Sequence, residues 1–96
     1  MRPSAVFEQN RELVREAVGR YPMRNPRIFG SVLHGTDKEG SDIDLLVDAP
    51  LGTTLLDLIG LEQELQEKLG VPVQVTTSEG LHRFIRDKVL AEAQPI

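Results

Sequence analysis

The segment Ser41–Asp48 limits the possible folds most, because it places apolar and acidic side chains at the spacing of a strand. Its four apolar residues predict a strand that is mostly buried. Successive side chains on a strand point to opposite faces, so Asp42 and Asp44 are expected on the same face. Two carboxylates side by side repel each other, and a cation between them offsets that cost. The pattern therefore predicts a divalent metal site of the oxygen-only kind that suits Mg²⁺.

Gly30 and Ser31 form a second short motif, about ten residues before the two aspartates. A glycine at the end of a strand lets the backbone come close to a ligand, and exposed N–H groups there can hold phosphate oxygens. The Ser31 hydroxyl can add one more donor. Alone, each motif has a plainer interpretation, as a solvated strand face or an ordinary turn. Together they favour a site for a metal–nucleotide complex.

The rest of the chain alternates helical and extended patterns. The predicted elements are a helix over 4–20, a strand over 27–29, a turn of helix and a loop over 32–40, a strand over 41–48, a helix over 53–69, a strand over 71–76 and a last helix from about residue 78. This order predicts an α/β arrangement of layers rather than a helical bundle or a β-sandwich.

The helical patterns also predict where each helix begins, ends and packs. Ser4 and Ser78 are predicted caps, and Thr53 and Thr54 are the candidate caps of the long helix, which Gly70 ends. Asn10 interrupts the first apolar face, and Pro72 predicts a strand at a sheet edge. The stripe of the long helix expected to face the core is Leu55, Leu58, Ile59, Leu61, Leu65 and Leu69, with Glu62, Glu64 and Glu67 expected in solvent.

Composition excludes several classes of function. With 96 residues the chain is expected to form one compact domain, and a net charge of −4 argues against broad binding to nucleic acid. A nucleotide remains compatible with this charge, because a divalent cation can offset the phosphates locally. There is no cysteine, no signal-peptide pattern and no apolar run of the ~20 residues that span a bilayer. We therefore expect a soluble cytoplasmic protein without a membrane partner.

Three pieces of the chain resemble the signature of the polymerase-beta-like nucleotidyltransferases. These are Phe29-Gly30-Ser31, then Gly35, then the run 41–47, which reads SDIDLLV. The short length is similar to that of their minimal branch, the MNT proteins. The closing strand and the ending 85–96 also resemble this family, so the likeness spans most of the chain and predicts one minimal nucleotidyltransferase domain over 1–96.

The resemblance implies a mixed β-sheet with helices packed on it, and transfer of a nucleoside monophosphate from a nucleoside triphosphate. Proteins of the MNT type are commonly paired with a HEPN-domain toxin, whose RNase activity they silence by transferring AMP from ATP to a tyrosine. By motif position, Asp42 and Asp44 are the implied catalytic residues and Mg²⁺ ligands. Gly30, Ser31 and Ser41 are the implied nucleotide-binding residues.

Two positions depart from the family pattern. Gln74 stands on the later strand where a third carboxylate is expected, and an amide cannot act as a general base. Asp48 and Glu79 are the acids that could replace it. His34 stands where similar proteins often carry an arginine, so a charge-assisted phosphate contact is missing there.

Three functions remain open from the sequence. The first is a Mg²⁺-dependent adenylyltransferase that acts on a HEPN-domain partner, favoured by Gly30-Ser31 with Asp42 and Asp44. The second is an antitoxin that neutralises its partner by direct binding with a degenerate site, favoured by Gln74. The third is transfer to a small molecule such as an aminoglycoside, which requires a substrate-binding region that 96 residues hardly provide.

Overall fold

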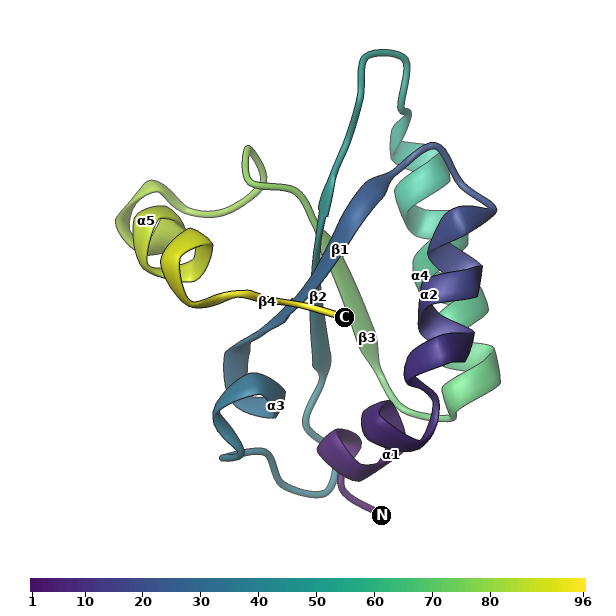
Figure 1. Ribbon diagram of the computed structural model, residues 1–96, viewed down its shortest axis with the longest axis vertical. Coiled ribbons are helices and arrows are strands. Elements are labelled where there is room, and N and C mark those ends of the chain that lie inside the picture. The colour runs from purple at the N-terminus through teal and green to yellow at the C-terminus, as the bar shows by residue number, and fades with distance from the viewer.

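The computed structural model describes residues 1–96 and arranges helices around a four-stranded sheet (Figure 1). The helices are α1 (Pro3–Gln9), α2 (Arg11–Gly19), α3 (Gly30–His34), α4 (Leu55–Leu69) and α5 (Arg83–Glu92). The strands are β1 (Arg24–Phe29), β2 (Ile43–Asp48), β3 (Val73–Thr76) and β4 (Gln94–Pro95). The α/β class predicted from the sequence is confirmed.

The sheet has the strand order β3-β2-β1-β4 and is mixed, as the resemblance implies. β2 and β3 run parallel, and the other two pairs are antiparallel. β3 lies at an edge, as Pro72 predicts, and side chains of α4 close that edge. The N–H of Val73 donates to Oε1 of Gln66 at 3.2 Å, and the N–H of Val75 donates to Oε2 of Glu62 at 2.9 Å. The expectation that Glu62 stays in solvent is therefore wrong, because its carboxylate satisfies a strand N–H.

The core lies on the face of the sheet that α2 and α4 cover (Figure 1). On β2, Ile43, Leu45 and Val47 alternate toward this core and are almost completely buried. This alternation is the one predicted for the segment. It leaves Asp44 for the opposite face of the sheet, and Asp42 lies just before the strand.

The first helical pattern forms two helices rather than one. The break falls at Asn10, whose backbone leaves the helical region and whose side-chain amide donates to the carbonyl of Val6 at 2.8 Å. Ser4 does not cap α1, because Pro3 already occupies its first turn and Ser4 lies inside the helix. The polar interruption visible in the sequence is thus a helix boundary.

β1 is longer than predicted and begins at Arg24. Its pairing with β2 shifts register between Arg24 and Arg27, and Asn25 between them has a φ of 53°. An asparagine in the left-handed region and a following proline hide this part of the strand from a pattern-based prediction.

α4 follows its predicted boundaries. Thr54 and Asp57 form a reciprocal capping box at its start, and Gly70 ends it with a φ of 72°. Part of the predicted inward stripe is wrong, because Leu55 is 70% exposed and Ile59 is 40% exposed. The core takes Leu61 and Leu65, flanked by the half-buried Leu58 and Leu69. A single stripe of a helix faces the core, and Ile59 lies about 100° around the helix from Leu58.

α5 lies on the other side of the sheet from α2 and α4 (Figure 1) and has no buried residue. It begins at Arg83 rather than near Ser78, with His82 as its cap, which accepts from the N–H of Phe84 at 3.2 Å. The predicted Ser78 cap is wrong, and the carbonyl of Ser78 accepts a hydrogen bond from Arg86 instead. β4, which the sequence did not predict, follows α5 and pairs with β1. None of the helices combines the length and the apolar character needed to cross a membrane.

Candidate nucleotide site

Strand pairing brings the two sequence motifs together where β1 ends and β2 begins. Phe29, the last residue of β1, is the register partner of Asp44, so Gly30 starts α3 beside the Asp44 carboxylate. On its other side Asp44 is the register partner of Gln74. Register partners share a face of the sheet, so this site lies opposite the apolar core.

Gly30 is required by the geometry of this junction. Its φ is +76°, in the left-handed region that glycine adopts without strain. A Cβ at this position would overlap Oδ2 of Asp44 and lie 3.2 Å from Cγ of the same side chain. The glycine therefore allows a close approach, as predicted, but the group that approaches in this structure is the protein's own carboxylate.

Asp42 and Asp44 are close enough to influence each other. Asp42 is exposed just before β2, and Asp44 is half-buried within it. Burial and then the charge of Asp42 raise the pKa of the Asp44 carboxyl above its ordinary value. A cation bound to both carboxylates would relieve their mutual repulsion and compensate Asp44 for the hydration that it loses on burial.

Gln74 occupies the place next to Asp44 that the sequence predicts for a third acid. Its side chain is exposed on β3, in register with Asp44. Neither proposed substitute is gathered into a cluster with the two aspartates, since no group of three or more potential acidic, His or Cys metal ligands exists. Asp48 instead accepts from Arg27 at 2.5 Å and from Asn25 at 3.1 Å at the far end of β2.

A pocket of about 380 Å³ lies between α3 and α5 and reaches the Gly30-Ser31 motif, while neither aspartate lines it. Gly30 and Ser31 line it from one side. On the same side, Nε2 of His34 lies 2.9 Å from Oε2 of Glu92 on α5, so an ion pair or hydrogen bond joins the two helices. His34 is therefore part of the pocket wall rather than a histidine in a free loop.

The sequence did not predict that α5 would form the opposite wall. The helix contributes Ile85, Lys88, Val89 and Glu92 to the pocket. These positions follow the spacing of one helical face, which was the available signal. The spacing cannot show which part of the molecule that face meets.

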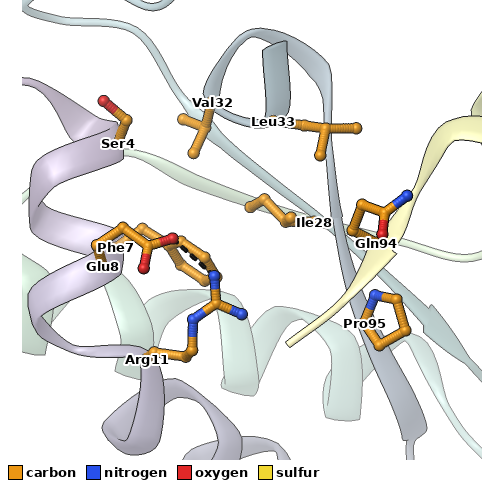
Figure 2. Close-up of a pocket in the computed structure, with 9 residues that line it drawn as sticks. All are labelled: Ser4, Phe7, Glu8, Arg11, Ile28, Val32, Leu33, Gln94 and Pro95. Atoms are coloured by element: carbon orange, nitrogen blue, oxygen red, sulfur yellow. Dashed lines mark hydrogen bonds and ion pairs between the residues drawn. The ribbon is translucent and has the colours of Figure 1, made fainter. Parts of the chain in front are cut away.

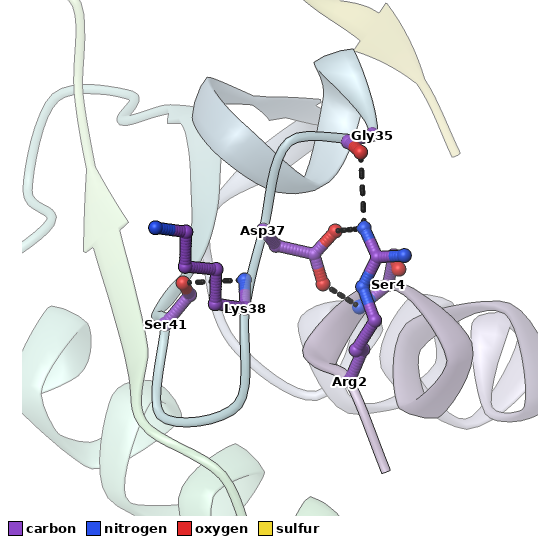
Figure 3. Close-up of polar contacts among 6 residues, drawn as sticks. All are labelled: Arg2, Ser4, Gly35, Asp37, Lys38 and Ser41. Carbon is purple, nitrogen blue, oxygen red and sulfur yellow. Dashed lines mark hydrogen bonds and ion pairs between the residues drawn. The ribbon is translucent and has the colours of Figure 1, made fainter.

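Ser41 lies in the loop between α3 and β2, where it has a structural hydrogen bond. Its Oγ accepts from the N–H of Lys38 at 2.9 Å and so closes the turn that leads into Asp42 (Figure 3). The side chain is half-buried and does not line the pocket. Its predicted contact with a nucleotide stays a prediction.

Asp37, in the same loop, is the buried acid that sequence analysis missed. Its carboxylate accepts from the N–H of Ser4 at 2.8 Å and from Arg2 at 3.0 Å, and Arg2 also donates to the carbonyl of Gly35 (Figure 3). Burial alone would raise the pKa of Asp37, but these hydrogen bonds outweigh it and hold the pKa below its usual range. The N-terminus is thus clamped to the loop that connects the two motifs.

A second cavity, of about 320 Å³, lies beside α1 (Figure 2), and neither aspartate lines it. It is formed by α1, α3, β4 and Ile28 of β1, next to the start of α2. Its only guanidinium, on Arg11, pairs with Glu8 at 2.6 Å and lies over the ring of Phe7 at 4.9 Å. The charges of this cavity are satisfied within the chain.

The residues present fit a divalent cation at Asp42 and Asp44. Both donors are carboxylate oxygens, and the raised pKa of Asp44 reflects its burial and the charge of Asp42, both of which a bound cation would offset. Mg²⁺ in nucleotide sites commonly takes only one or two carboxylates from the protein, with phosphate oxygens and waters as its other ligands. A pair of aspartates, one of which lies against Gly30, meets that requirement.

Comparisons with known proteins support the same assignment. The family model described as "Nucleotidyltransferase domain" matches residues 11–96. The chain is 42% identical over 74 residues to a Methanocaldococcus jannaschii protein named "Putative protein adenylyltransferase", covering 77% of this chain and 80% of that protein. It is 38% identical over 73 residues to the protein adenylyltransferase MntA of Thermococcus cleftensis, covering 76% and 74% of the two chains.

Solved structures share the fold. One described as "Structure of putative minimal nucleotidyltransferase" has a TM-score of 0.85 and 39% identity, covering 97% of this chain and 95% of that one. A toxin–antitoxin crystal structure with AMP-PNP has a TM-score of 0.77 and 20% identity, covering 90% and 71%, and shows likeness of fold alone. The chain described here belongs to the nucleotidyltransferase domain family and is a minimal nucleotidyltransferase.

Proposed function

We propose that this chain is an antitoxin that transfers AMP from ATP to a HEPN-domain toxin in a Mg²⁺-dependent reaction. One observation carries the proposal. Asp44, which is influenced by the charge of Asp42, lies against Gly30, and Gly30 lines a pocket between α3 and α5. The ATP requirement agrees with the cytoplasmic location expected from the sequence.

Each side of the site has a chemical task in this proposal. Asp42 and Asp44 would hold Mg²⁺, which when bound supplies positive charge to the phosphate oxygens of ATP. Gly30 and Ser31 would hold phosphate oxygens through backbone N–H groups and the Ser31 hydroxyl. The pocket beyond them would take the rest of the nucleotide.

The transfer itself is a displacement at the α-phosphorus of ATP. A hydroxyl oxygen of the acceptor protein forms the new P–O bond, the bond from the α-phosphorus to the bridging oxygen breaks, and pyrophosphate leaves. The acceptor hydroxyl releases its proton to solvent water in the process. Gln74 cannot take that proton, so β3 supplies no general base. Positioning and charge compensation therefore have to provide most of the rate enhancement.

The relatives support a protein as the acceptor. Two proteins at least 38% identical to this chain carry the name of a protein adenylyltransferase. The toxin–antitoxin structure that shares the fold contains AMP-PNP. Both observations favour an ATP-dependent antitoxin over an enzyme that modifies a small molecule.

Gln74 favours a second candidate function, in which the chain neutralises its partner by contact. An exposed amide beside Asp44 weakens the acid–base chemistry and leaves nucleotide binding possible. In this case the fold would be retained as a binding module, and complex formation would not depend on Asp42 or Asp44.

Intact-mass spectrometry separates the two candidates. A HEPN-domain protein encoded in the same genome is incubated with this chain, ATP and Mg²⁺, and its mass is followed over time. The double variant Asp42→Asn, Asp44→Asn removes the metal ligands. Asp48→Asn is the matched control, because it makes the same type of substitution on β2, at a side chain that pairs with Arg27 and Asn25.

We expect a mass gain of one or more AMP units with the wild type and with Asp48→Asn, and none with the double variant. An unchanged mass in all three reactions, with the two proteins still co-purifying, would replace the enzyme by the binding module. A gain that persists in the double variant would contradict the assignment of Asp42 and Asp44.

A further inference from the structure

The pocket between α3 and α5 lacks an obvious cation for phosphate on its α3 side. The residue there with a basic side chain is His34, and its Nε2 is engaged with Glu92. Glu92 is also the only acidic side chain that lines the pocket. This pairing removes both groups from a role in binding the charge of a nucleotide.

Lys88 is the only lysine or arginine among the residues that line the pocket. It lies four residues before Glu92 on α5, so the two side chains share a face of the helix. The Glu92–His34 contact holds that face against α3, and the pairing of β4 with β1 fixes the end of the helix. Lys88 is therefore held across the pocket from Gly30 and Ser31.

Lys88 is also free to bind an external anion. Six of the eleven Lys and Arg side chains form ion pairs within the chain, whereas Lys88 has no hydrogen bond or ion pair and is exposed. An ammonium group on a flexible stem binds phosphate as a point charge and does not require a fixed approach. Ile85 and Val89, its apolar neighbours on the same helical face, line the pocket beside it.

We infer that Lys88 is a phosphate-binding residue of the nucleotide site, which it completes from α5 because position 34 holds a histidine engaged with Glu92. This inference rests on the proposed function, since it takes ATP as the ligand. It makes α5 part of the nucleotide site as well as of the fold. It also assigns the charge compensation to a part of the chain far from the Gly30-Ser31 motif.

Binding of ATP with Mg²⁺, measured by isothermal titration calorimetry at several KCl concentrations, tests the inference. Lys88→Met keeps the length and apolar stem of the side chain and removes its charge. Lys88→Arg restores a cation. Lys68→Met is the matched control, because Lys68 lies on α4 and pairs with Glu64 outside the pocket. Thermal unfolding of each variant establishes that α5 is intact.

We expect Lys88→Met to weaken binding about 10- to 100-fold, the range for a charge-assisted contact. We also expect its affinity to depend less steeply on salt than that of the wild type. Lys88→Arg should recover most of the affinity, and Lys68→Met should bind like the wild type. A merely structural role would weaken binding without changing the salt dependence.

Two results would overturn the inference. Wild-type affinity in Lys88→Met, while Asp42→Asn with Asp44→Asn still loses binding, would remove Lys88 from the site and leave the proposed function standing. A failure of Lys88→Arg to recover affinity, with an unchanged salt slope, would show that packing rather than charge matters there. If the wild type itself does not bind ATP, both the inference and the adenylyltransferase function fall.

Discussion

The backbone of Gly30 lies directly against the carboxylate of Asp44, and any side chain at position 30 would overlap Oδ2 of that carboxylate. The two residues come from different motifs and meet through the pairing of Phe29 with Asp44. The position of Asp44 therefore depends on the absence of a Cβ at position 30.

Gly30→Ala is expected to abolish Mg²⁺-dependent nucleotide binding and to reduce AMP transfer on the order of 10²-fold or more, since a misplaced catalytic group costs about that much. The new methyl group must displace the Asp44 side chain. Transfer is measured by intact mass of the acceptor, and ATP binding by calorimetry.

Gly35→Ala separates this effect from backbone strain. Gly35 also has a left-handed φ, +71°, but a Cβ there would meet nothing within 4 Å. Both variants should lose about 1–2 kcal/mol of unfolding free energy, the cost of a left-handed non-glycine residue. Only Gly30→Ala should lose ATP binding. Equal binding by the two variants would contradict the role assigned to this contact.

Asp44→Asn is expected to raise the thermal stability of the metal-free protein slightly while removing Mg²⁺ binding. The pKa of the Asp44 carboxyl is higher in the folded protein than in the unfolded chain. The protonated side chain therefore contributes stability at pH values below its pKa in the unfolded chain, and this contribution is lost as the pH rises through its pKa in the folded protein. At neutral pH the charged side chain therefore destabilises the fold, by less than about 1 kcal/mol because it is half-exposed. Differential scanning calorimetry in EDTA at pH 5 and pH 7.5 measures the difference.

The stabilising effect of Asp44→Asn should shrink at the lower pH, as protonation of the wild-type carboxyl becomes easier. Asp48→Asn, which breaks the pairing with Arg27, should lower stability instead. A loss of stability in Asp44→Asn at neutral pH would show that the carboxylate is favourably bound within the apo protein.

Gln74→Glu is expected to increase the rate of AMP transfer, up to on the order of 10²-fold if the new carboxylate serves as a general base. The substituted residue would lie in register with Asp44 on the adjacent strand. It should also tighten Mg²⁺ binding and lower metal-free stability, because a third acid increases the repulsion. Gln63→Glu, exposed on α4, makes the same change away from the site. Equal rates for both variants would mean that the acceptor proton does not limit the reaction.

Asp37→Asn is expected to lower the midpoint of thermal unfolding by several degrees and to free the N-terminal helix. The pKa of Asp37 is lowered in the folded state, so its stabilising contribution is present above the unfolded value of about 3.9 and is lost as the pH falls through the folded value. The wild type and Asp37→Asn should therefore converge in stability in strong acid. Unfolding curves from pH 7 to pH 2 measure this, and hydrogen exchange of α1 should increase in the variant.

Arg2→Ala provides a second test of the clamp. It removes the donor to Asp37 and to the carbonyl of Gly35 but leaves the Ser4 N–H in place. Its effect on stability should be smaller than that of Asp37→Asn. A larger effect would indicate that the Gly35 contact, rather than the buried carboxylate, anchors the N-terminus.

The sequence by itself determined the features that depend on neighbouring residues. Alternation along Ser41–Asp48 predicted the buried strand, which in the structure begins at Ile43, and the position of Asp44 opposite the core residues of that strand. Thr54 and Gly70 marked the ends of α4, because capping interactions reach only a few residues along the chain. The spacing of the two motifs was sufficient for the resemblance that the family match later confirmed.

Only the tertiary structure decided the features that depend on partners far away in the sequence. The burial of Asp37 requires Arg2 and Ser4 from the N-terminus, and the pocket requires α5, which meets α3 through Glu92 and His34. The two residues of β4 are too few to form a recognisable pattern, and they pair only because β1 offers a free edge. Long-range contacts of this kind leave no local periodicity, so the sequence could place the acids of the site but not the walls that surround them.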